Sequence, residues 1–164
     1  MTRGDVTDQQ VADLINRVAE AASAIISGNI RRYIELVKHA EDYTLMAPLG
    51  GDTRRGFDGS DEAIEAMENY FQGGEAVVDL VQSYASGDLV VLVIIERQHG
   101  RVGGLPDQDL SLRVTLVFRR EVSDWMLVHR HADPLVHSTD HNRLAALFRG
   151  DGEDGFMVRS PDQG

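Results

Sequence analysis

The sequence predicts one α+β domain in which three helices cover one face of a curved antiparallel sheet. Two observations lead to this fold class. Apolar residues recur with a helical period in the first part of the chain, and extended, strand-like apolar segments follow from about residue 76. The length of 164 residues, with 42% hydrophobic and 26% charged residues, suits a single core. The expected order of elements is ααβαββββ.

The first two helices are marked by residues that favour helix ends. Thr7 and Gln10 have the spacing of a capping box, and Gly28 follows the last apolar residue of the period. Asn29 can cap a second, shorter helix. A short strand, YTLMAP at residues 43–48, comes next and is ended by its proline.

The third helix begins after Ser60, because Ser60 is a favourable N-cap and acidic residues follow it. Gly73 and Gly74 are expected to end this helix. Four strands then follow, joined mostly by short turns, so that neighbours run antiparallel. They are expected at residues 76–85, 89–99, 109–121 and 124–136.

The last two strands can be sorted into two faces by their alternation. Pairing Arg120 with Trp125 across the turn puts Trp125, His129 and His131 on the face that looks toward the helices. Arg113 then falls on the opposite face. A shift of one residue would exchange the two sets, so the side of Arg113 stays open between pocket and dimer interface.

The strand at residues 89–99 is apolar at both parities, which is typical of a strand covered on both faces. The helices can cover only one face. We therefore expect a second copy of the chain on the other, giving a homodimer through the sheet face.

Composition excludes several classes of function. The chain has no cysteine, so a disulfide framework and a thiolate nucleophile are both excluded. A formal net charge of −11 argues against a nucleic-acid partner. The longest apolar run, residues 89–95, is too short to cross a bilayer, and the N-terminus lacks an apolar signal core. We expect a cytoplasmic protein with no membrane partner.

The domain is expected to occupy residues 1–149. Residues 150–164 form an acidic, glycine-rich segment with the composition of a solvated tail. Its apolar residues Phe156, Met157 and Val158 are expected to lie against the domain or a second subunit.

The final strand and the first strand together resemble a known family. The segments WMLVHRHADP at residues 125–134 and AEDYTLMAP at residues 40–48, in the order ααβαββββ, resemble the nuclear transport factor 2-like superfamily with its cystatin-like fold. The chain is most similar to its SnoaL-like branch and to the association domain of calmodulin-dependent kinase II. The resemblance covers roughly residues 7–136. It implies a cone with an internal pocket and dimers formed through the sheet, but no single activity.

The resemblance also allows one activity to be tested. Ketosteroid isomerases of this superfamily place a proton-shuttling aspartate where this chain has Ala47, and an oxyanion-stabilising tyrosine where it has Ala21. Neither alanine can supply a base or hold an enolate. The ketosteroid isomerase mechanism is therefore disfavoured.

His131 is the expected acid or base at the pocket, because it lies toward the open end of the cone and histidine is readily tuned near neutral pH. His129 can equally be a structural histidine bonded to a neighbour. The expected pocket residues are His129, Trp125, Tyr33, Tyr43, Met46, Phe57 and Glu96.

His129 and His131 are also candidate metal ligands, since both imidazoles of such a pair project to one side of a strand. Asp133 shares that side, but a complete site needs Glu96 or His137 as well. Strand parity makes such pairs common by chance, so we predict neither a metal nor another cofactor. His137, like His141, is expected in a solvated loop.

Three functions follow from these observations. The first is a protein that binds a small, largely apolar molecule in the cone pocket. The second is a lyase, cyclase or isomerase that uses His131 as acid or base. The third is an oligomerisation or interaction module that assembles through its sheet face.

Overall fold

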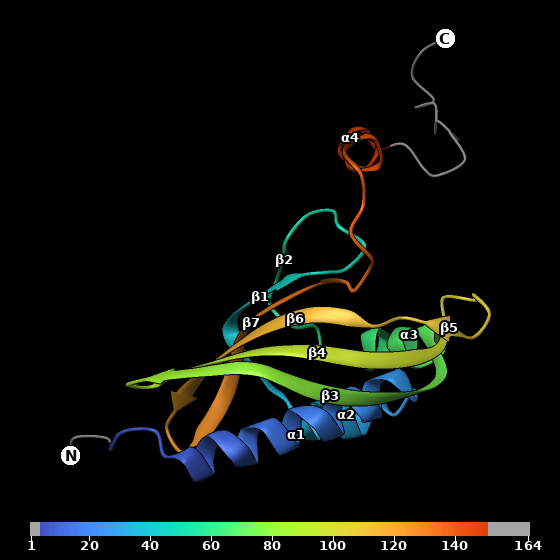
Figure 1. The fold of residues 1–164 in the computed structure, drawn as a ribbon. Coiled ribbons are helices and arrows are strands. Elements are labelled where there is room, and N and C mark those ends of the chain that lie inside the picture. Colours follow the sequence, from blue (N-terminus) through green and yellow to red (C-terminus); the bar gives the residue numbers. More distant parts are fainter. Residues whose placement is uncertain (1–3, 151–164) are drawn as a thin grey trace.

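The computed structural model describes residues 4–150 (Figure 1). The predicted contacts of Phe156, Met157 and Val158 lie outside these residues. The helices are α1 (Asp8–Ile26), α2 (Ile30–Leu36), α3 (Asp61–Tyr70) and α4 (His141–Arg149). The strands are β1 (Lys38–Met46), β2 (Arg54–Arg55), β3 (Phe71–Ser86), β4 (Leu89–Val102), β5 (Gln108–Asp109), β6 (Leu112–Glu121) and β7 (Asp124–Pro134). The α+β class and the order of the main elements are confirmed, and α4, β2 and β5 are additions.

The strands form one sheet in the order β2-β1-β7-β6-β4-β3, with β5 beside β4. The predicted antiparallel neighbours β3, β4, β6 and β7 are all found. The sheet is nevertheless mixed, because β1 runs parallel to β7. These two strands are separated by most of the chain, so no hairpin turn sets their relative direction.

The predicted helix starts are confirmed in detail. The Thr7 hydroxyl accepts from the Gln10 amide at 3.1 Å, and the Gln10 side chain accepts from the Thr7 amide at 2.9 Å, which completes the capping box. The Ser60 hydroxyl accepts from the amide of Ala63 at 3.3 Å. Each bond satisfies a backbone donor that the first turn of a helix leaves unpaired.

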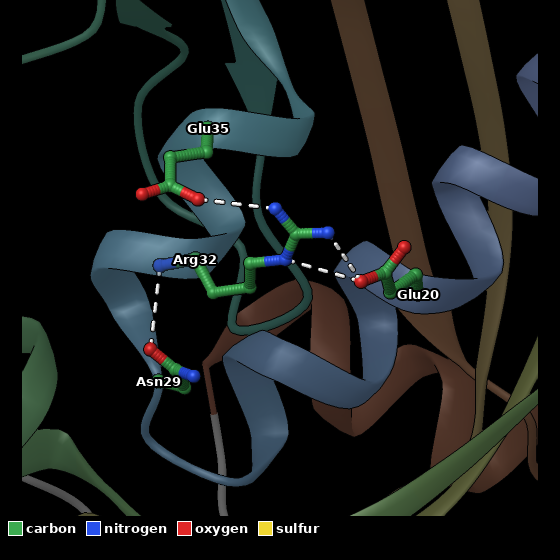
Figure 2. A network of polar contacts seen from close by, with 4 residues as sticks. All are labelled: Glu20, Asn29, Arg32 and Glu35. Atoms are coloured by element: carbon green, nitrogen blue, oxygen red, sulfur yellow. Dashed lines mark hydrogen bonds and ion pairs between the residues drawn. The ribbon is translucent and has the colours of Figure 1, made fainter.

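Polar contacts fasten α2 to α1 (Figure 2). The Asn29 side chain caps α2 by accepting from the Arg32 amide at 3.3 Å. The Arg32 guanidinium donates to Glu20 of α1 at 2.6 Å and to Glu35 at 3.0 Å. Ion pairs as exposed as these contribute little to stability.

Gly73 and Gly74 do not end a helix, as the sequence predicts, but lie within β3, which begins directly after α3. A Cβ atom on Gly74 would lie 2.3 Å from the carbonyl oxygen of His99 and 2.8 Å from the side chain of Ile26. Glycine at this position therefore permits the close approach of β3 to β4 and α1.

The core lies between α1 and the inner face of the sheet. Helix α1 packs against β3 and β4, and α2 packs against α1. In β4 the residues Val90, Leu92 and Ile94 are almost fully buried on this inner face. Their neighbours Val91, Val93 and Ile95 point to the outer face and are only half-buried. Of the helices described, none is long and apolar enough to cross a membrane.

Candidate functional site

A β-bulge in the last strand decides which side chains reach the interior. Phe118 of β6 pairs with Leu127, but the next residue, Val117, pairs with His129, so Val128 is left without a partner. One extra residue in a strand exchanges the faces of every residue beyond it. Arg130 therefore lies opposite the buried Leu116 on the inner face.

The expectation that His129 and His131 face the helices is therefore wrong, because the extra residue in the bulge turns both side chains to the other face of the sheet. Both lie on the outer face. The Nδ1 atom of His129 is 2.8 Å from the Oγ1 atom of Thr44, a hydrogen bond of the structural kind that was considered for it. His131 is exposed, and its register partner on β1 is Met46.

Arg113 also lies on the outer face, where its guanidinium makes two 2.7 Å hydrogen bonds to Asp133. The open question of its side is settled, because Arg113 and Asp133 are register partners across β6 and β7. Glu96, in contrast, points inward. The ligand set considered for a metal is therefore divided between the two faces, and residues 4–150 contain no cluster of three or more metal-ligating side chains.

A buried ion pair crosses the inner face of the sheet. Arg130 donates from Nη1 and Nη2 to the two carboxylate oxygens of Glu96, at 2.7 and 2.9 Å. The Glu96 side chain is 5% exposed and that of Arg130 is 22% exposed. Burial lowers the pKa of Arg130 while the facing Glu96 charge raises it, and the net direction is upward. The Arg130 guanidinium therefore stays charged at neutral pH.

The ion pair borders a cavity of about 50 Å³ between α1, α2 and the sheet. Its walls are mostly apolar, and its polar groups come from Tyr33, Glu96 and Arg130. The lining residues are Val18, Ala21, Ala22, Ile25, Tyr33, Val37, Glu96, Leu116, Phe118, Leu127 and Arg130. Two of the predicted pocket residues, Tyr33 and Glu96, thus line it directly.

Two other predicted wall residues, Tyr43 and Phe57, do not line the cavity. They contact His39, which the sequence did not indicate and which in turn contacts the cavity residue Tyr33. His39 stacks on Phe57 with ring centroids 3.8 Å apart, and meets the edge of Tyr43 at 4.7 Å. Its Nε2 atom is 3.2 Å from the hydroxyl of Tyr33. Burial, aided by the nearby positive Arg130, lowers the pKa of His39 to about 4, so its imidazole is neutral at pH 7.

The two remaining predicted wall residues lie elsewhere. Trp125 is buried in the core, where the guanidinium of Arg120 covers its ring at 5.2 Å. Met46 is 43% exposed and belongs to the outer side of β1, beside His131. The expected oxyanion position, Ala21, does line the cavity, and it contributes only a methyl group there.

His39 and Arg130 are the functional candidates that sequence reasoning missed. The predicted strand began at Tyr43, whereas β1 begins at Lys38 and includes His39. Strict alternation from Trp125 predicts the outer face for Arg130, because the bulge has no signature in the sequence. A strand extended back to Lys38 would have placed His39 at an even spacing from Tyr43.

The site combines hydrogen-bonding groups with apolar walls. An aromatic histidine–tyrosine pair and a neutralised ion pair supply hydrogen-bonding groups inside an apolar wall, which is the usual make-up of a small-molecule site. Burial and the neighbouring Tyr43 raise the pKa of Tyr33, so its hydroxyl stays protonated and can donate.

The solved structures that this chain resembles share its fold. A provisionally named dehydratase of the NTF2-like family from Streptomyces avermitilis is 21% identical, with a TM-score of 0.57, and covers 79% of this chain and 96% of its own. A cystatin-like protein of unknown function from Nostoc punctiforme is 13% identical, with a TM-score of 0.60, covering 80% and 95%. The CamKII hub homology domain of Chlamydomonas reinhardtii is 19% identical, with a TM-score of 0.53, covering 77% and 98%.

No curated protein matches the chain. The model of the SnoaL-like domain family matches residues 12–137, which include most of α1, the whole sheet and the residues that line the cavity. This match covers more than half of the chain, and the similar structures have the NTF2-like, cystatin-like fold; the chain therefore belongs to the SnoaL-like domain family.

Proposed function

We propose that this chain binds a compact, uncharged and largely apolar molecule in the cavity between α1, α2 and the sheet. The observation that carries the proposal is the placement of Tyr33 and the Arg130–Glu96 pair in an otherwise apolar wall. Apolar walls with a few fixed polar groups give affinity through burial and orientation through hydrogen bonds.

The charge of the site restricts the ligand. Arg130 already has a bidentate partner in Glu96, so the pair presents no net charge to the cavity. A charged ligand would be buried without a counter-ion, which is strongly unfavourable. A carbonyl or hydroxyl group, in contrast, can bond to the Tyr33 hydroxyl or to a remaining guanidinium hydrogen.

The size of the site restricts the ligand further. A cavity of about 50 Å³ exceeds the roughly 10–15 Å³ that one water needs, but falls short of the several hundred Å³ usual for drug-sized ligands. Small ketones and alcohols such as acetone and isopropanol are therefore better probes than ring compounds, because a cavity that holds benzene has a volume of about 150 Å³.

Thermal shift and calorimetric titration with acetone and isopropanol test this proposal. Both should raise the melting temperature of the native chain in proportion to the logarithm of their concentration. Ala21→Leu fills the cavity and should abolish the shift. Ala12→Leu, on the exposed side of the same helix, is the matched control and should leave it unchanged. Equal shifts in the two variants would refute binding in this cavity.

A second function, self-association through the outer sheet face, is supported by a separate observation. Val91, Val93, Ile95 and Val117 form a half-buried apolar strip on that face. Charged pairs such as Arg113 with Asp133 border this strip, which is the usual arrangement of an interface core and rim. Among the similar structures, one carries the name of a hub domain.

Light scattering on the eluting protein tests self-association. The native chain should elute as a dimer at micromolar concentration, and Val93→Glu should shift it to the monomer because a charge would be buried in the strip. Val122→Glu, in the exposed β6–β7 turn, is the control. A monomeric native chain would refute this second function and leave the first untouched.

A further inference from the structure

Helix α4 carries an apolar stripe that its own chain leaves uncovered. Leu144, Leu147 and Phe148 share one side of the helix by their spacing, and they are 41%, 70% and 84% exposed. No residue of α4 is buried. Figure 1 shows the helix standing clear of the sheet and of the other three helices.

Such a helix needs a partner to be stable. Its ends are well formed, since Asp140 accepts from the Arg143 amide at 2.8 Å and Gly150 adopts the left-handed conformation that closes a helix. Nine residues are still too few for a stable helix in water, where most of the stability of a short helix comes from packing its apolar side. The capping signals and the stripe thus indicate a docked helix.

The edge strand β3 has the complementary surface. Val77, Val81 and Tyr84 are 66%, 60% and 59% exposed along a strand of 16 residues. A long edge strand with exposed apolar residues is normally covered. β3 contains Glu75 and Asp79 and no basic residue, whereas α4 contains two arginines and no acidic residue. Asp79 already pairs with Arg97 of β4, but the Glu75 side chain is 87% exposed. The two elements therefore match in apolar character, and Glu75 supplies a negative charge for the basic helix.

We propose that α4 is an arm that docks on β3 of a second copy of this chain. In one chain the two elements lie at opposite ends of the molecule (Figure 1), because β3 is the strand farthest from β1 and β2. Two copies related by a two-fold axis can each place α4 on the β3 of the other. Tyr84 is also the register neighbour of Val91, so the arm would extend the apolar strip of the outer face.

The inference rests on self-association, the second function proposed above, and adds the element that closes the dimer. It also explains why the apolar stripe and the open edge occur in the same chain. Each would be a liability for aggregation alone, and each covers the other in the dimer.

Disulfide trapping tests the arm directly, because the chain has no cysteine of its own. One chain carries Leu147→Cys and a differently tagged chain carries Tyr84→Cys. Mild oxidation of the mixture should link the two tags. Leu49→Cys, at an 89% exposed apolar position, replaces Leu147→Cys as the control and should give no mixed product. In parallel, Leu147→Glu with Phe148→Glu should weaken the dimer at least about tenfold by light scattering.

The outcomes separate the two proposals. A native chain that is monomeric throughout the micromolar range overturns self-association and the arm together. A native dimer that is unaffected by the α4 substitutions and gives no mixed disulfide overturns the arm alone. A bridge that forms only when both cysteines are in one chain also overturns it, because α4 would then fold back on its own sheet.

Discussion

Breaking the ion pair at the cavity should destabilise the chain strongly, and replacing both partners should not. Arg130→Met leaves the Glu96 carboxylate, only 5% exposed, without its counter-ion. Two charge centres about 4 Å apart interact by about 4 kcal/mol at an effective dielectric constant of 20. Loss of one partner in a buried pair typically costs about 3–5 kcal/mol, and the partial exposure of Arg130 favours the lower end. Arg130→Met with Glu96→Leu should restore most of that stability.

Urea unfolding followed by the fluorescence of Trp125, the single tryptophan, measures these free energies at one fixed protein concentration. Arg32→Met is the control, since it removes a guanidinium that also pairs with two carboxylates but lies at the surface. Its effect should be much smaller. The reasoning fails if Arg130→Met lowers the free energy of unfolding no more than this control does. It also fails if the loss in the double variant equals the sum of the losses in the two single variants.

Two further predictions concern pH and packing. Because the pKa of His39 falls from 6.5 to about 4 on folding, the unfolded state binds more protons between these values, so stability should fall as pH drops from about 6.5 to 4. The free energy of unfolding lost through this residue is about 3 kcal/mol. His39→Phe should remove this pH dependence, which a series of urea unfolding curves between pH 4 and about 6.5 measures. An unchanged dependence of stability on pH in the variant would contradict the assignment to His39. Gly74→Ala should lower the melting temperature sharply, because its Cβ would meet the His99 carbonyl at 2.3 Å, whereas Gly59→Ala, with no contact closer than 3.7 Å, should not. Equal melting temperatures for the two would contradict the close packing.

Much of the fold could be predicted because its signals are local. The capping box at Thr7, the cap at Ser60 and the apolar period of α1 act within one or two helical turns. The pairing of Arg120 with Trp125 was correct because a short turn sets the register next to it.

The site was harder to predict because it depends on distant strands. The direction of β1 beside β7 is set by packing over most of the chain, and no local signal records it. The sequence predicts Gly74 as a helix stop, but in the structure its missing side chain lets β3 pack closely against β4 and α1. His141 looked like a loop residue, yet it begins α4.

The sequence by itself determined the α+β class, the starts of α1, α2 and α3 and the presence of a last strand rich in histidine. Only the tertiary structure decided which of those side chains face the cavity. The physical reason is the unpaired Val128: before it, Trp125 and Leu127 keep the predicted inner face, and after it Arg130 replaces His129 and His131. Alternation has a period of two, so one residue that only strand pairing reveals moved the polar centre of the site from the histidines to the Arg130–Glu96 pair.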